Sequence, residues 1–217
     1  MTTALIGHTG FVGGNLARAQ RFDALFNSRN FREIAGAKFK LVVCAGLSAA
    51  KWLANRDPAA DWAAISALAD VLRQVEADWF LLIATIDVYP SPREVDEGSP
   101  ISDGQCQPYG GNRLRFERFI ASQFPNTHVL RLSALFGPGL KKNILFDLLH
   151  DNLLETINPL SRFQWYDVQD LWRDIETVMA KQVRLINLVN EPVSTSELLS
   201  RFFPGKHVGA TAAPASY

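Results

Sequence analysis

A tyrosine and an arginine four residues apart are the first residues of this chain whose spacing suggests chemistry. Tyr109 and Arg113 lie in PYGGNRLRFE, which has helical character, so both side chains are expected on one helical face. A fixed cation beside a phenol stabilises the phenolate and lowers its pKa, which suits acid–base catalysis. Thr85 follows an apolar run, and its hydroxyl could bond the same substrate oxygen. These three residues form the predicted catalytic set.

A glycine pattern near the amino terminus predicts a phosphate-binding turn. The apolar residues 4–6 lead directly into GHTGFVGG, and a helical pattern follows. The first glycine permits a tight turn, the second lets the backbone approach a pyrophosphate, and the third lets the helix pack close to the strand. A plain strand-to-helix turn is the alternative, and His8 is expected to face solvent. The predicted cofactor contacts in this turn are Gly7, Thr9, Gly10, Phe11, Val12 and Gly13.

The residues after the second apolar run should decide which cofactor binds. A carboxylate there would bond the ribose 2′-hydroxyl and select NAD. The sequence instead reads Asn27, Ser28 and Arg29, with no carboxylate before Glu33. Because a guanidinium offers charge-assisted hydrogen bonds to phosphate, these residues favour NADP, with NAD as the alternative. An arginine that simply faces solvent would carry no such preference.

The elements that must position these residues alternate along the chain. Short apolar runs occupy residues 4–6, 24–27, 41–45, 79–84, 128–132 and 185–189, and helical patterns occupy residues 11–21, 62–75 and 112–123. Continuously apolar strands are buried on both faces, and their alternation with helices implies right-handed crossovers. The sequence therefore predicts an α/β fold, a Rossmann-like doubly wound parallel sheet with helices on both faces.

Length and composition limit the classes of function. The chain has 217 residues, 47% of them hydrophobic, and its 22 basic and 22 acidic residues balance. One domain is expected, without a broad charged surface for nucleic acid or membrane. Two cysteines give neither a disulfide framework nor a zinc spacing, so no metal site is expected. The sequence shows no signal peptide and no run near the ~18 apolar residues of a membrane span, so a cytoplasmic protein is expected.

The order of these motifs resembles the extended short-chain dehydrogenase/reductase family, the NAD(P)-dependent sugar epimerases, dehydratases and reductases. The resemblance rests on GHTGFVGGNL, VVCAG, ATIDVY, DEGSP, PYGGNRLRFE, VLRLSALFGPG and FQWYDVQDL. It implies that Thr85 is the catalytic Ser/Thr and that Tyr109 is the acid/base of the YxxxK motif. It also implies that Ala45 and Gly46 line the adenine–ribose side of the cofactor, and that residues 132–136, beginning with Leu132, pass the nicotinamide.

Two further residues are assigned to the substrate by the same resemblance. Asn143 falls where the family often contacts substrate. Asp87 is a candidate second acid/base, because some dehydratases of the family use a carboxylate near this position. A carboxylate that caps the loop is the equal alternative for Asp87. Lys51 could face the mouth of the site or lie on the surface.

The chain departs from the family pattern in ways that bear on activity. Arg113 stands in place of the YxxxK lysine, which in the family binds the nicotinamide ribose and lowers the pKa of the tyrosine, so the resemblance also assigns Tyr109 and Arg113 to the cofactor. Ala64 stands where the family has a helix asparagine. The carboxyl-terminal substrate lobe, from about residue 137 to 217 and partly interleaved with the main domain, is short, so a bulky nucleotide-sugar would be poorly enclosed. The tail at residues 207–217 is expected to fray.

Two functions follow as expectations. The first is an NADP-preferring oxidoreductase, epimerase or dehydratase that acts on a sugar-like or small carbonyl or hydroxyl substrate. The second is a non-catalytic NAD(P)-binding sensor or partner protein of the same fold, suggested by Arg113 and the short lobe. A homodimer formed through the Tyr109 helix is also possible, as in many members of the family.

Overall fold

The computed structural model describes residues 2–102 and 104–216. Its centre is a six-stranded sheet in the order β2-β1-β3-β4-β5-β9, in which every neighbouring pair is parallel. The strands are β1 (Thr3–Ile6), β2 (Ala24–Phe26), β3 (Lys38–Cys44), β4 (Glu76–Thr85), β5 (Thr127–Leu132) and β9 (Leu185–Leu188). The six predicted strands are confirmed, with ends shifted by a few residues at most.

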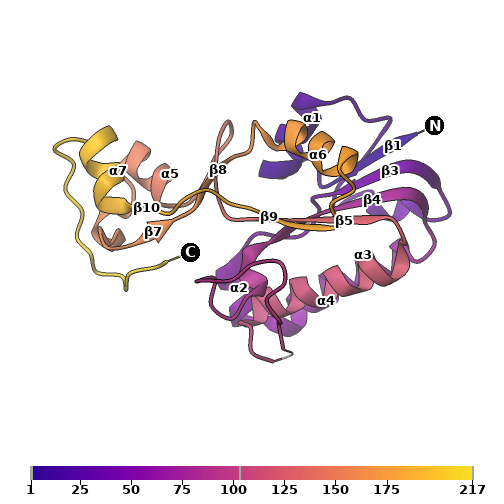
Figure 1. Ribbon diagram of the computed structural model, residues 1–217, viewed down its shortest axis with the longest axis horizontal. Helices are drawn as coiled ribbons and strands as arrows, with labels where there is room; N and C mark the ends of the chain where they lie inside the picture. Colours follow the sequence, from indigo (N-terminus) through magenta and orange to yellow (C-terminus); the bar gives the residue numbers. More distant parts are fainter. Residues whose placement is uncertain (1, 103, 217) are drawn as a thin grey trace.

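Helices cover both faces of the sheet (Figure 1). On one face α3 (Pro58–Leu72) and α4 (Pro108–Gln123) pack on the strands, and on the other face α1 (Phe11–Ala19) and α6 (Leu171–Ala180) do so. The strands are continuously apolar because successive side chains enter opposite cores. Val42 lies in the core under α3 and α4, whereas its neighbour Val43 lies in the core under α1 and α6. The doubly wound fold is therefore confirmed.

The strand order reverses beside β1, which pairs with β2 on one side and β3 on the other. In open α/β sheets the crevice at such a reversal, outside the carboxyl ends of the strands, is where ligands bind. Gly7 lies at this point with φ +91°, and an added Cβ would approach the carbonyl oxygen of Ala45 to 2.3 Å. Only glycine allows the two chain segments after β1 and β3 to lie this close.

A smaller lobe follows β5. It contains β6 (Ala134–Phe136) paired with β8 (Trp165–Asp167), and β7 (Arg162–Phe163) paired with β10 (Val193–Ser194). Helices α5 (Ile144–His150) and α7 (Thr195–Phe202) and the 3-10 turn η3 (Leu154–Thr156) complete it around its own apolar cluster. Because α6 and β9 lie between β8 and β10 in the sequence but pack in the main domain, the two parts interleave (Figure 1).

The tail is ordered as far as Ser216, so the expectation that it frays is wrong. The amides of Gly209 and Thr211 donate to the carbonyls of Leu154 and Glu155 at 3.1 and 2.9 Å. Further along, the amide of Arg162 donates to the carbonyl of Ala215 at 2.9 Å. The tail has no apolar periodicity, and backbone hydrogen bonds to the lobe supply its order.

The loop after β4 packs against the sheet through a buried polar network. Arg131 forms a buried ion pair with Glu117 and donates to the hydroxyl of Tyr89 at 2.7 Å. That hydroxyl donates to the carbonyl of Asp96 at 2.7 Å. Asp96 therefore helps to fix the loop in place. The Glu97 carboxylate also accepts a hydrogen bond from the amide of Asn187 at 2.5 Å. Residue 103 of this loop lies outside the described residues.

Candidate active site

The glycine turn presents unused backbone amides at the start of α1. Gly10 is the N-cap residue, and as a glycine it has no side chain to cap this end. Amides in the first turn of a helix have no acceptor within the helix, so those of Phe11, Val12 and Gly13 point out of its end. An added Cβ at Gly13 would lie 2.2 Å from the carbonyl oxygen of Gly7, whereas one at Gly10 would meet only that oxygen, at 3.3 Å. The turn therefore packs against its own backbone, most tightly at Gly13, and the amides at the start of α1 fit a phosphate group.

The residues after β2 form a hydrogen-bonded turn beside this cradle. The amide of Asn27 donates to the Asn30 side chain at 2.7 Å, and the amide of Arg29 donates to the Asn27 side chain at 2.8 Å. Asn27 Nδ2 also lies 3.1 Å from His8 Nε2. His8 is thus half-buried beside a predicted cofactor residue rather than facing solvent as expected. Ser28 and Arg29 are exposed, as the 2′-phosphate interpretation requires.

Thr85, Asp87 and Lys51 form a polar chain at the carboxyl end of β4. The extended geometry stops at Thr85, and the 3-10 turn η2 (Ile86–Val88) follows. The Thr85 hydroxyl accepts from the amide of Asp87 at 3.1 Å and donates to its carboxylate at 3.3 Å. Lys51, from α2 (Lys51–Arg56), donates to the same carboxylate at 2.6 Å. The sequence left Lys51 open between the surface and the site; the structure places it at the site.

Tyr109 lies in the first turn of α4 against this group. Its backbone amide donates a hydrogen bond to Asn55 Oδ1 of α2 at 2.9 Å. The next residue, Gly110, allows α4 to touch η2, because an added Cβ would lie 1.8 Å from the carbonyl oxygen of Asp87. The tyrosine is 8% exposed. Glycine at position 110 is therefore what holds Tyr109 next to Asp87.

The environment of Tyr109 makes the phenol a weaker acid. Burial is the largest effect and raises its pKa; Arg113 lowers the pKa, Asp87 raises it and Lys51 lowers it, and the net direction is upward. The expectation that Arg113 brings this pKa below its ordinary value is wrong, because removal of the phenolate from water outweighs the nearby charge.

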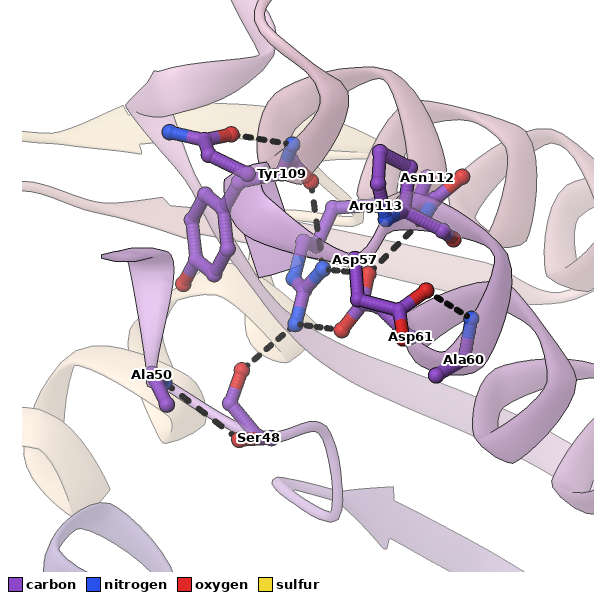
Figure 2. A network of polar contacts seen from close by, with 10 residues as sticks. Ser48, Ala50, Asp57, Ala60, Asp61, Tyr109, Asn112 and Arg113 are labelled. Carbon is purple, nitrogen blue, oxygen red and sulfur yellow. Dashed lines mark hydrogen bonds and ion pairs between the residues drawn. The ribbon is translucent and has the colours of Figure 1, made fainter. Parts of the chain in front are cut away.

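Arg113 is tied to Asp61 rather than presented to the crevice (Figure 2). Its guanidinium forms a two-pronged ion pair with the Asp61 carboxylate of α3 and is 3% exposed. It also donates to the carbonyls of Ser48 at 2.6 Å and Tyr109 at 3.2 Å. Its central carbon lies 3.8 Å from the centre of the Tyr109 ring, a stacking contact. Arg113 thus braces α4 against α3 and supports the ring of Tyr109.

The other residues predicted to contact the cofactor lie around the same edge of the sheet, and one residue predicted to contact substrate lies in the lobe. Ala45 and Gly46 follow β3 beside the glycine turn, and Leu132 is the last residue of β5. Asn143 has a local role that the sequence did not reveal: its side chain accepts from the amides of Leu145 and Phe146 and so caps α5. Its contact with substrate stays a prediction.

A cavity of about 200 Å³ opens beside Lys51 and Asp87. Its walls come from α2, η2, the loop after β4, the start of α4 and the tail. The lining residues are Lys51, Asp87, Tyr89, Pro90, Pro92, Gln107, Gly110, Ala215 and Ser216. No group of side chains in the described parts of the chain is arranged to hold a metal ion. Across residues 2–102 and 104–216, no helix has the length and apolar character of a membrane span.

Neutralising Lys51 and neutralising Asp87 should shift the Tyr109 pKa in opposite directions. Lys51→Met removes a charge that lowers this pKa and should raise it further, whereas Asp87→Asn should lower it. Titration of ring-labelled tyrosines by NMR, with Tyr109→Phe to assign the signal, measures both. Shifts in the same direction would contradict this placement of the charges.

Because folding raises this pKa above the unfolded value of about 10, the contribution of Tyr109 to stability should fall as the pH rises past about 10.

Comparison with known proteins gives structural matches only. No family model and no curated protein matches the sequence. Among solved structures, a dTDP-4-dehydrorhamnose reductase from Clostridium acetobutylicum superposes with a TM-score of 0.71 at 14% identity, over 100% of this chain and 84% of that one. A UDP-glucose 4-epimerase from Thermotoga maritima gives 0.68 at 13% identity, over 100% and 85%.

A third similar structure is a dTDP-glucose 4,6-dehydratase from Streptomyces venezuelae with NAD bound. It gives a TM-score of 0.70 at 16% identity, over 91% of this chain and 79% of that one. Because all three identities are low, these matches bear on the fold and not on the activity. The chain has the Rossmann-like fold that these sugar-nucleotide enzymes share.

Proposed function

We propose that this chain is an NAD(P)-dependent oxidoreductase of the extended short-chain dehydrogenase/reductase family, acting on a small hydroxyl or carbonyl compound. The observation that carries the proposal is the uncapped glycine turn at the strand reversal. Its amides and the Thr85–Asp87–Tyr109 group lie at the carboxyl ends of β1 and β4, two parallel strands of one sheet that β3 separates. This edge is where open α/β sheets bind nucleotides and carry out chemistry.

The glycine turn would hold the pyrophosphate of the cofactor on the amides of Phe11, Val12 and Gly13, and Arg29 would meet the 2′-phosphate. Ala45, Gly46 and Leu132 would line its remaining length. When bound, the nicotinamide supplies or accepts a hydride. In the similar structures, NAD accompanies the dehydratase from Streptomyces venezuelae. The residues of this chain fit such a cofactor because the first amides of α1, which have no acceptor within the helix, follow the glycine turn.

Tyr109 would exchange a proton with the substrate oxygen, and the Thr85 hydroxyl would orient that oxygen. Burial raises the pKa of this phenol and so disfavours the phenolate. A phenol can donate a proton to a carbonyl oxygen, which is the role that reduction requires. Lys51 and Asp87 would set the charge around this oxygen, and Arg113 would hold the ring of Tyr109 in place through the stacking contact.

A single substitution tests the proposed preference for NADP. Arg29→Ala should weaken binding of NADPH about ten-fold or more, since a charge-assisted contact to phosphate contributes about 1.5–3 kcal/mol. Binding of NADH should not change. Fluorescence titration with each nucleotide measures both affinities, and Arg32→Ala, in the neighbouring turn η1 (Phe31–Ile34), is the control for a general loss of positive charge. Equal losses for the two nucleotides would remove the 2′-phosphate argument.

A non-catalytic nucleotide-binding protein is the second candidate, and one observation favours it. Arg113 is held by Asp61 and the Ser48 carbonyl, so it is not presented to a ribose as the YxxxK lysine of the family is. The two candidates differ in turnover. An enzyme oxidises bound NADPH when a panel of small carbonyl compounds is added, whereas a sensor binds NADPH and leaves it reduced with every member of the panel.

A further inference from the structure

The last described residues of the chain are bonded to the lobe and face the main domain across a cavity. Figure 1 shows the segment after α7 running past the lobe toward α2. Three hydrogen bonds that each involve one side chain hold this segment on the lobe, in addition to the bonds between backbone groups. Thr211 Oγ1 donates to the carbonyl of Glu155 at 2.7 Å, and Asn158 Nδ2 donates to the carbonyl of Ala212 at 2.9 Å. The amide of Ala215 donates to Ser161 Oγ at 3.0 Å.

This anchored segment ends at the candidate site. Ala215 and Ser216 line the same cavity as Lys51 and Asp87. The opposite walls belong to the main domain, and Asp87 there also contacts Thr85. A substrate that reaches Thr85 and Tyr109 through this cavity must therefore fit between the main domain and the tail.

The cavity is partly open to solvent, and its size limits the part of a substrate that lies between the main domain and the tail. Its volume is about 200 Å³, whereas pockets for drug-sized ligands measure about 300–1,000 Å³. A nucleotide-linked sugar is at least drug-sized. With the tail seated, the space suits one sugar ring or a smaller hydroxyl or carbonyl compound.

We infer that residues 211–216 act as a size selector, which restricts the site to substrates of monosaccharide size and excludes nucleotide-linked sugars. This inference rests on the proposed function, because it assigns the cavity to the substrate of that reaction. The selecting residues are Ala215 and Ser216, and the bonds made by Thr211, Asn158 and Ser161 hold them in place.

Binding of UDP-glucose, the nucleotide-sugar of one similar structure, tests the selector. The intact chain, saturated with NADPH, should show no binding by calorimetry in the millimolar range. Two full-length variants should release the tail: Asn158→Ala combined with Ser161→Ala and Thr211→Val, and separately Ala215→Pro, which removes the amide that bonds Ser161. Each should bind UDP-glucose at least ten-fold more tightly than the intact chain. Faster hydrogen exchange at the amides of Gly209 and Thr211 should accompany this gain.

The matched control is Leu160→Ser, which changes a side chain that is 77% exposed in the same stretch of the lobe. It should leave both UDP-glucose binding and amide exchange unchanged. Binding of UDP-glucose by the intact chain would overturn the inference, and so would failure of both tail variants to bind it. The NADPH titration of the same samples separates the two proposals: failure to bind NADPH contradicts the proposed function, whereas the UDP-glucose result decides the role of the tail.

Discussion

Asp61→Ala should destabilise the chain by about 3–5 kcal/mol, the usual cost of removing one partner from a buried ion pair. The Arg113 guanidinium would be left charged, buried and without its carboxylate. Asn112 would lose its bond to the same carboxylate at 2.8 Å, so the contact between α3 and α4 would weaken further. For a chain of this length each kcal/mol lowers Tm by about 2–4 °C, so thermal unfolding should show a fall on the order of 10 °C.

Two controls show whether the loss comes from the unpaired charge. Asp70→Ala removes an exposed partner of Arg73 on the same helix and should cost less than about 1 kcal/mol. Asp61→Leu combined with Arg113→Met replaces the buried pair by apolar side chains and should recover most of the stability, because no charge is left buried. A double variant as unstable as Asp61→Ala would contradict the charge explanation.

Gly110→Ala should cost about 3 kcal/mol or more, at the upper end of the range for overpacking. Its Cβ would lie 1.8 Å from the carbonyl oxygen of Asp87, which belongs to the backbone and cannot turn aside. The start of α4 must then move away from η2 and carry Tyr109 away from Asp87. Denaturant unfolding measures the loss of stability. The movement should also reduce the effect of Asp87→Asn on the Tyr109 pKa.

The next residue provides the control for Gly110→Ala. An added Cβ at Gly111 meets only Cys106 Cβ, at 4.0 Å, so Gly111→Ala introduces no clash. Alanine in a helix interior is favoured over glycine by about 0.5–1 kcal/mol, and this variant should be slightly stabilised. Equal losses at positions 110 and 111 would show that α4 does not touch η2 as described.

The sheet and its helices could be predicted because their signals are local. Residues 41–45 and 79–84 are apolar without alternation, which indicates burial on both faces, and both runs became central strands. The spacing of the glycines, directly after an apolar run and before a helical pattern, likewise predicted the turn between β1 and α1. The starts of helices were harder to predict, since α3 begins at Pro58, four residues before the helical pattern predicted for residues 62–75.

The charges of the site depend on contacts that no local pattern encodes. Arg113 meets Asp61, which lies 52 residues earlier, so the sequence could not show that its charge is already neutralised. The Tyr109 pKa depends on burial by the whole fold. Thr85 caps the 3-10 turn η2, and this turn brings the Asp87 carboxylate back to the Thr85 hydroxyl. The order of the tail likewise comes from bonds to distant backbone.

The most direct test of the central claim is a titration of the intact chain and of Gly10→Glu with NADPH and NADH. Gly10 has φ −77°, which any residue can adopt, and an added Cβ would meet only the carbonyl oxygen of Gly7, at 3.3 Å, so the glutamate should require only a small local shift of the turn. Its bulk and negative charge would occupy the place of the pyrophosphate. We expect tight binding by the intact chain, none by Gly10→Glu and unaltered binding by the control Gly14→Ala. Binding of neither nucleotide by the intact chain, or equal binding by Gly10→Glu, would contradict a nicotinamide cofactor at this turn.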